Sequence, residues 1–432
     1  MSSVFSLHKD LPINRRREVR TIQGSNARGT GPDDLSREIF GVLGLPVDSL
    51  DLPAVLQRIG SAAADASPLL ISTPNVNFLI ASRSNTQFRD SLLMSDLCLP
   101  DGMPIVWIAR LLGIPIKKRI SGSDLFEALK SELKGAAPLK VFLFGGAEGA
   151  AETVCKSLNS QAGGLTCVGV LNPGFGTLDE ISSQEIIETI NSSTADLLAV
   201  FFGAMKAQGW LLLNRHRLTV PIRAQFGATI NFQAGLTKRA PKLFQEAGLE
   251  WLWRIKEEPY LWRRYWDDGS KLLWLVLNSA LPLWLSARWM HLRGLSKADP
   301  LIVEVNEDNR SVIVNLSGFL TAKYVDRAIP YFRRALGTDK QIIVDLSKAR
   351  GVDPRFFGLF LMLYKTTFGR SRRLQFTGVT PRMARTFRLN GFDFLLSAEA
   401  VISSKIDCRL PEGTRPSQSA QFRRLQDDQL LP

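Results

Sequence analysis

The sequence has few of the residues that build metal sites or disulfide frameworks. Among its 432 residues are three histidines and four cysteines, and no two cysteines form a Cys-x-x-Cys pair. This scarcity argues against a His/Cys zinc site and against a fold held together by disulfides. It favours a reducing, cytoplasmic compartment. We therefore expect no metal site.

The sequence also lacks an apolar run long enough to cross a bilayer. The longest, residues 272–287, falls short of the roughly 20 residues that a spanning helix needs. Three residues interrupt it: Asn278, Ser279 and Pro282. Arg15-Arg16-Arg17 is not followed by an apolar segment, so a secretory signal is not expected. Residues 1–36 are predicted to be a disordered basic arm.

Positive charge is in excess. The chain has 54 Lys and Arg against 41 Asp and Glu, a formal net charge of +13. This excess favours an anionic partner: nucleic acid, an anionic membrane surface or a phosphorylated substrate. With 45% apolar residues, the chain has enough material for the cores of two or three domains.

Between residues 37 and 247, short apolar runs alternate with helical patterns. The candidate strands are Leu69–Ser72, Leu97–Leu99, Lys140–Phe144, Leu165–Val170, Leu197–Phe202 and Val220–Arg223. This alternation predicts a Rossmann-like α/β domain, with a mostly parallel sheet and helices on both faces. Ligands bind such sheets at the carboxyl ends of the strands, so we expect the functional residues there.

Polar residues and glycines follow these strands. Helix starts are indicated by Thr73-Pro74, by Met103-Pro104 behind Asp101, and by Ser121 three residues before Asp124. The Asp101 carboxylate, just after a strand, is suited to removing a proton from an acceptor hydroxyl. Gly145-Gly146 would let backbone N–H groups approach a phosphate. The alternative is that Thr73 and Asp101 only cap helices and that Gly145-Gly146 is a turn.

Tryptophan and arginine are concentrated in residues 248–298. Seven of the nine tryptophans lie between Trp251 and Trp289, interleaved with Lys and Arg. Such a mixture suits the headgroup layer of a membrane, so we expect a helical, membrane-binding appendage. The alternative is a helical hairpin packed on the α/β domain or on another subunit. Nucleic acid is not expected as a partner, because aliphatic runs such as Leu272–Leu277 suit lipid better than a single strand.

A small α/β domain is expected over residues 299–403. Strands are predicted within 303–316 around a turn at 306–310, and at 341–346 and 373–376, with helices at 324–336, 355–368 and 381–389. Residues 404–432 are polar and rich in Gln, which predicts a disordered tail.

Several ordered motifs resemble the WecG/TagA/CpsF glycosyltransferases, glycosyltransferase family 26, over about residues 38–268. They are Thr73-x-Asn75, Pro100-Asp101-Gly102, Arg119-x-x-Gly122-x-Asp124-Leu125, Phe226–Gly235, Arg239-Ala-Pro241, Gly248-Leu-Glu-Trp251, Arg254 and Glu258-Pro259. The resemblance implies an inverting enzyme that moves a sugar from a UDP-sugar to a polyprenyl-diphosphate-linked saccharide. It also implies exopolysaccharide or other cell-surface polysaccharide synthesis at the cytoplasmic face of the membrane, with peripheral attachment and no metal or other cofactor.

The resemblance assigns roles residue by residue. Asp101 stands at the family's proposed catalytic base. The expected substrate-binding residues are Thr73, Asn75, Arg119, Gly145, Gly146, Gln208, Arg239, Arg254, Arg263 and Arg264. The last three match basic residues of a C-terminal appendage that is thought to close over the active site at the membrane.

One segment departs from the family pattern. Where members usually have Gly-x-Pro-x-Gln-Glu, this chain has Gly203-Ala-Met205-Lys-Ala-Gln208-Gly209, without the proline and glutamate and one residue longer. The departure favours an alternative function, a non-catalytic scaffold that keeps the fold and recruits other proteins of a polysaccharide-assembly complex. The intact Asn75, Asp101 and Arg119 favour an enzyme.

Residues 301–398 resemble a STAS domain, the sulfate-transporter and anti-sigma-factor-antagonist type. The motifs are Val314-Asn-Leu-Ser-Gly318, Ile343-Val-Asp345-Leu-Ser347, and Val352-Asp353 with Gly358 following. Regulatory members carry a phosphorylatable serine two positions after the aspartate, where this chain has Arg355, so a phosphoserine switch is not expected. The resemblance implies docking of a protein partner or sensing of a small ligand. The alternative is a structural appendage that stabilises the rest of the chain.

Overall fold

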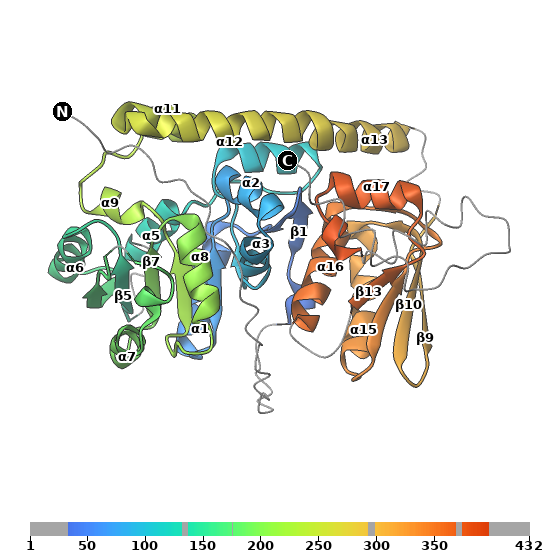
Figure 1. Ribbon diagram of the computed structural model, residues 1–432, viewed down its shortest axis with the longest axis horizontal. Coiled ribbons are helices and arrows are strands. Elements are labelled where there is room, and N and C mark those ends of the chain that lie inside the picture. The colour runs from blue at the N-terminus through green and yellow to red at the C-terminus, as the bar shows by residue number, and fades with distance from the viewer. Residues whose placement is uncertain (1–32, 132–136, 175, 293–298, 369–373, 397–432) are drawn as a thin grey trace, which may run out of the picture. The chain divides into compact units, whose positions relative to one another are not determined.

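The computed structural model describes residues 33–131, 137–174, 176–292, 299–368 and 374–396 (Figure 1). Most of the expected basic arm and the whole expected tail, residues 404–432, lie outside these ranges. The predicted arm is wrong for its last residues, because Asp34–Ser36 forms a short 3-10 helix, η1, in which Leu35 is buried.

The first domain is built on a six-stranded sheet. Its strands stand in the order β4-β3-β8-β7-β5-β6, and every pairing is parallel. They are β3 (Leu69–Ser72), β4 (Leu97–Cys98), β5 (Leu139–Gly145), β6 (Leu165–Leu171), β7 (Leu197–Phe201) and β8 (Ile222–Gln225). All six predicted strands are confirmed, β3 with the predicted ends and the other five with small shifts at their ends.

Helices cover both faces of this sheet, as predicted. Alternate residues of β5 point to opposite faces, since Val141 and Leu143 belong to one apolar core and Phe142 and Phe144 to another. The first core includes residues of α1 (Leu52–Ala64), α5 (Gly122–Ser131), α6 (Ala150–Ser160) and α9 (Thr229–Gln233); the second includes residues of α7 (Gln184–Ser192) and α8 (Ala204–Leu213). A sheet buried on both faces requires the near-continuous apolar strands that the sequence shows.

A β-hairpin precedes the sheet and was not predicted. Strands β1 (Ile39–Val42) and β2 (Leu45–Asp48) pair antiparallel through Leu43 and Gly44, whose φ angles are 48° and 106°. Two-residue hairpin turns favour positive φ because this geometry matches the twist of the strands. Asn, Asp or Gly usually marks such a turn. Because leucine stands at the first position of this turn, the sequence does not indicate the hairpin.

Residues 242–292 form a helical appendage. After α10 (Lys242–Glu246), α11 (Glu250–Glu257) and the short η3 (Pro259–Leu261), the helix α12 (Trp262–Leu275) continues through a π-helical turn, η4 (Val276–Ala280), into α13 (Leu281–Leu292). Figure 1 shows α11, α12 and α13 in a row, with α12 against α2 (Val76–Ser84). The π turn directly precedes Pro282, which lacks the N–H that a regular helix uses. No helix among the described residues is long and apolar enough to cross a membrane.

The C-terminal domain is a second, smaller α/β unit, as predicted. Strands β12, β10, β11 and β13 form a parallel sheet in that order, and β9 pairs antiparallel with β10. The elements are β9 (Ile302–Glu307), β10 (Ser311–Leu320), α15 (Val325–Leu336), β11 (Gln341–Asp345), β12 (Ala349–Val352), α16 (Pro354–Thr367), β13 (Leu374–Thr377) and α17 (Pro381–Leu389). Strand β12 was missed because Ala-Arg-Gly-Val shows no apolar alternation.

Helix α16 joins the two domains by packing on the hairpin strand β1. A side chain at Gly358 would overlap the Ile39 carbonyl. Arg355 donates from Nη1 to the Ile39 oxygen (3.2 Å), and Lys365 Nζ contacts Asp96 Oδ1 of the first domain (2.7 Å). Residues of both domains also share one apolar core. These contacts favour the expectation that the C-terminal domain stabilises the rest of the chain.

The structure joins Cys155 of α6 and Cys167 of β6 as a disulfide. The sequence argued against a fold held together by disulfides, and it did not predict this single pair. Helix α6 packs directly on β6, the edge strand of the sheet, and this packing brings the two cysteines together. Cys98 is buried and free.

Candidate active site

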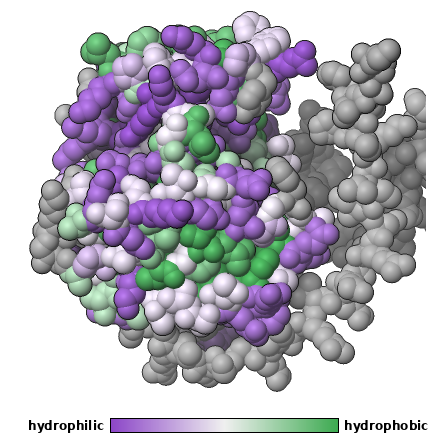
Figure 2. Space-filling view, turned by 90° about the vertical axis from the view of Figure 1, so that its left-hand side faces the viewer, coloured by the Kyte–Doolittle hydropathy of each residue, from purple (hydrophilic) through white to green (hydrophobic). Residues whose placement is uncertain are grey.

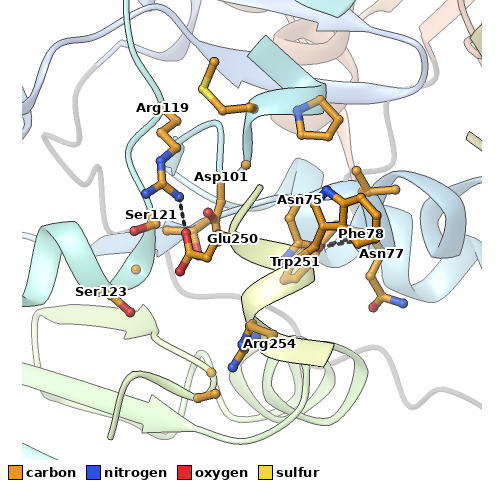
Figure 3. A pocket seen from close by; sticks show the side chains of 18 of the residues that line it. Asn75, Asn77, Phe78, Asp101, Arg119, Ser121, Ser123, Glu250, Trp251 and Arg254 are labelled. Carbon is orange, nitrogen blue, oxygen red and sulfur yellow. Dashed lines mark hydrogen bonds and ion pairs between the residues drawn. The ribbon is translucent and has the colours of Figure 1, made fainter. Parts of the chain in front are cut away.

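A cavity of about 410 Å³ lies at the carboxyl ends of β3, β4 and β8, where ligands of parallel α/β sheets bind. The appendage helices α11 and α12 supply one of its walls. Figure 3 shows Asp101 near the middle of the view, with Arg119 on one side and Asn75 and Trp251 on the other. The polar and aromatic lining includes Thr73, Asn75, Asn77, Asp101, Arg119, Ser121, Ser123, Gln225, Gln245, Glu250, Trp251, Arg254, Arg264, Tyr265 and Asp268.

The loop after β3 places Thr73 and Asn75 in the cavity wall. Helix α2 (Val76–Ser84) starts later than predicted, and its N-cap is Asn75, whose Oδ1 accepts the backbone N–H of Asn77 (3.1 Å). The predicted cap Thr73 is thus wrong, although Thr73 lines the cavity. Helix α4 (Met103–Leu111) starts where predicted, but its N-cap is Gly102 with a φ of 89°. The alternative that Thr73 and Asp101 only cap helices is therefore wrong.

Asp101 lies near the middle of the cavity, and its carboxyl group has a raised pKa. Its backbone N–H donates to the Pro74 oxygen (3.0 Å), which ties the loop after β4 to the loop after β3. Burial and then repulsion from Glu250 raise the pKa of Asp101 from 3.8 to about 7, against the attraction of Arg119 and Arg254. A carboxyl group with a pKa near neutrality is suited to general-base catalysis.

Arg119 is held by the appendage. Its Nη1 donates to Glu250 Oε2 (2.7 Å), and its Nη2 donates to Gln245 Oε1 (3.2 Å). The neighbouring Asp124 forms the predicted capping box with Ser121, and Arg239 donates to its carboxylate. Burial alone would raise the pKa of Asp124, but these hydrogen bonds outweigh burial and lower it.

Arg254 places a cation in the cavity. Among the described residues, this cation has no carboxylate partner. Its Nε is buried and has no hydrogen-bond partner, and its guanidinium lies 5.2 Å from the centre of the Phe232 ring. A buried N–H without an acceptor is costly, so this group is best satisfied by an anionic ligand.

The structure brings six of the eleven predicted site residues to the cavity: Thr73, Asn75, Asp101, Arg119, Arg254 and Arg264. The other five do not line it. Gln208 is buried beneath it and donates from Nε2 to Ser72 Oγ (2.7 Å), Arg239 pairs with Asp124, and Arg263 is exposed beside Trp262.

Gly145 and Gly146 also lie outside the cavity lining. Both have positive φ, 87° and 101°; Gly145 is the last residue of β5, and Gly146 follows it. Helix α6 begins only at Ala150, with Gly149 as its N-cap, so these two glycines do not stand at a helix N-terminus.

Sequence reasoning missed several residues of the cavity. Glu250 and Trp251 lie in the quoted motif Gly248-Leu-Glu-Trp251, but nothing there indicates that Glu250 pairs with Arg119. Asn77 and Asp268 carry no sequence signal, because they meet only when α12 packs on α2. Within the described ranges, no group of three or more His, Cys, Asp and Glu is arranged to hold a metal ion.

The fold and the cavity define an α/β protein with a cavity at the strand ends, lined by a candidate general base. The chain belongs to the WecG/TagA/CpsF family of glycosyl transferases, whose family model matches residues 40–285, more than half of the chain. A second model, described as Mlab, STAS domain, matches residues 303–397. Both resemblances found in the sequence are thus confirmed, and the chain is a glycosyltransferase by family.

Two relatives carry the same name, N-acetylglucosaminyldiphosphoundecaprenol N-acetyl-beta-D-mannosaminyltransferase. The protein of Bacillus spizizenii (strain W23) is 27% identical over 198 residues, which are 45% of this chain and 73% of that protein. The protein of Bacillus subtilis (strain 168) is 25% identical over 221 residues, which are 50% and 80%. A crystal structure of an SsGBP variant covers 60% of this chain and 88% of its own at 10% identity, with a TM-score of 0.17, too low to carry an argument.

Proposed function

We propose that this protein moves a sugar from a UDP-sugar to a polyprenyl-diphosphate-linked saccharide during the synthesis of a cell-surface polysaccharide. The observation that carries the proposal is Asp101, a carboxyl group with a pKa near 7 that faces a cavity next to two arginines. The names of the relatives support the lipid-linked acceptor, because both proteins act on an N-acetylglucosaminyl diphosphoundecaprenol.

Different cavity residues would remove the proton and stabilise the leaving group. Asp101 would remove the proton from the attacking hydroxyl of the acceptor, so that the oxygen forms the new glycosidic bond with inversion. Arg254, whose Nε lacks a partner, and Arg119 would stabilise the charge that develops on the UDP leaving group. Arg119 would exchange Glu250 for the diphosphate of the donor. These cations supply positive charge at the leaving group, and we propose that the reaction needs no metal ion.

A membrane surface is proposed as the place of the reaction. Several large apolar side chains of the appendage are exposed, among them Leu243, Trp251, Trp262, Trp266, Leu273, Trp274, Leu285, Trp289 and Leu292. By contrast, the face in Figure 2 is largely hydrophilic, with separate smaller apolar patches. Exposed Trp and Leu beside Arg and Lys fit the headgroup layer of anionic lipids, which favours peripheral attachment at the cytoplasmic face.

The scaffold alternative rested on the altered segment around Gln208. Because Gln208 is buried and lies outside the cavity lining, this departure leaves the cavity residues in place. The test is to incubate the purified protein with a panel of UDP-sugars and a short-chain prenyl-diphosphate N-acetylglucosamine, and to measure UDP release. Acceptor-dependent release that Asp101→Asn abolishes is expected. No release with any donor would favour the scaffold.

A further inference from the structure

The cavity holds a second polar group, on the other side of Asp101 from Arg119. Asp268, on α12, is only 9% exposed, and its Oδ2 lies 3.3 Å from Nδ2 of Asn77, on α2. Both residues line the cavity. Figure 3 shows Arg119 and Asn77 on opposite sides of Asp101. The candidate base therefore stands between two polar regions of the cavity.

Asp268 has few hydrogen-bond donors for a buried carboxylate. A carboxylate offers about four lone-pair directions. Among the described residues, only Asn77 donates a hydrogen bond to it, and that bond is long. Burial raises the pKa of Asp268, against the hydrogen bond from Asn77 and the attraction of Arg264. A ligand that brings hydroxyl groups would supply the donors that this carboxylate lacks.

Aromatic rings border the same region. Trp251 and Tyr265 both line the cavity, and their ring centres lie 6.4 Å apart. A sugar ring has an apolar face of C–H groups and an edge of hydroxyls. An aromatic surface next to a carboxylate and an amide matches both parts, since polar groups fix orientation while apolar ones supply contact area.

The position of Asp268 on α12 distinguishes the acceptor from the donor. One turn earlier on the same helix, Arg264 also lines the cavity, and residues four apart on a helix are neighbours on its surface. This pairing of cation and carboxylate fits a diphosphate joined directly to a sugar, a group that both substrates contain, so the acceptor is assigned from the opposite side of α12. The same helix exposes Trp266 and Trp274, so α12 separates the cavity from the proposed membrane surface.

We propose that Asp268, Asn77 and Trp251 form the subsite that binds the sugar of the lipid-linked acceptor, with Arg264 at its diphosphate. This inference rests on the proposed function and adds the residues that select the acceptor. In this arrangement the acceptor enters from the membrane side along α12. Its attacking hydroxyl faces Asp101, and the donor diphosphate lies beyond Asp101 at Arg119 and Arg254.

The test compares Asp268→Asn with the matched control Asp267→Asn. Asp267 is the preceding residue, is exposed, and pairs with Lys271 outside the cavity. Binding of short-chain prenyl-diphosphate N-acetylglucosamine is measured by calorimetry, and KM is measured for both substrates. Asp268→Asn should weaken acceptor binding roughly 10- to 100-fold, the usual effect of a hydrogen bond to a charged group, with the KM of the UDP-sugar unchanged. Asp267→Asn should change neither quantity.

Acceptor analogues with the 3- or 6-hydroxyl replaced by hydrogen show whether the contact is direct. One of them should bind more weakly than the parent sugar to the wild type and equally well to Asp268→Asn. Wild-type-like acceptor binding by Asp268→Asn, a lower melting temperature alone, or a raised KM for the UDP-sugar alone would overturn the subsite and leave the proposed function standing. If the wild type binds no acceptor, the proposed function fails and the subsite with it.

Discussion

Replacing Asp101 with asparagine should slow catalysis and stabilise the protein at the same time. Asparagine keeps the shape of the side chain but cannot accept the proton of the acceptor hydroxyl. General-base catalysis contributes roughly 10²- to 10⁴-fold, so kcat should fall by that factor. In the wild type, kcat/KM should rise with pH through an apparent pKa near 7, because the basic form of Asp101 is the ionised one.

The gain in stability follows from the same pKa. Asp101 ionises near 3.8 in the unfolded chain and near 7 in the folded protein, so the folded state holds more protons between these values. The wild type therefore loses stability as the pH rises from about 4 to 7. A shift of about three units corresponds to about 4 kcal/mol at 1.36 kcal/mol per unit, an upper limit because water in the cavity screens the charge. Asparagine avoids this cost.

Urea unfolding at pH 4 and pH 8 measures the effect. Asp101→Asn should match the wild type at pH 4 and unfold at a higher urea concentration at pH 8. The matched control is Asp179→Asn, which alters an exposed carboxylate and should be neutral at both values. Equal midpoints at pH 8, or activity that stays constant from pH 5 to 8, would refute the assignment of Asp101 as a buried general base.

Three further outcomes are expected. High salt or carbonate should wash the protein from membranes, because the appendage is proposed to lie on the bilayer; release by detergent alone would contradict this. Turnover should survive excess EDTA, because Arg119 and Arg254 are proposed to neutralise the leaving diphosphate; loss restored by Mg²⁺ or Mn²⁺ would contradict it. Lys365→Met should lower the melting temperature by several degrees, since it removes the buried cation that pairs with both Asp34 and Asp96 at the domain interface, at a cost of about 1–3 kcal/mol. Arg334→Met, on an exposed side chain, should not; an equal effect of both would refute the role of Lys365.

The sheet and the position of the candidate general base were predictable because both depend on local sequence. Each strand is an apolar run of a few residues, and the edge where such strands end follows from the parallel α/β pattern. Asp101 could be placed at that edge without knowledge of any distant contact. The same reasoning failed for Gly145, which was expected to help bind a phosphate. Gly145 ends β5, and the next helix begins only at Ala150.

The remaining features depend on contacts between residues far apart in the sequence. Glu250 reaches Arg119, and Asp268 reaches Asn77, only because the appendage folds back over the strand ends. Gln208 was misplaced for a related reason. A polar residue near a strand end can point into the cavity or beneath it, and its hydrogen bond to Ser72 decides between the two.

The hairpin that the sequence did not reveal connects the C-terminal domain to the candidate general base. Asp48, at the end of β2, accepts a hydrogen bond from the Cys98 N–H (2.6 Å) and pairs with Arg37 (2.8 Å). Cys98 ends β4, three residues before Asp101. Because α16 packs on the partner strand β1, contacts of the C-terminal domain support the loop that carries Asp101. A domain that resembles a regulatory module is thus part of the framework that positions the candidate catalytic residue. Disrupting its contacts with β1 should change kcat, even though none of its described residues lines the cavity.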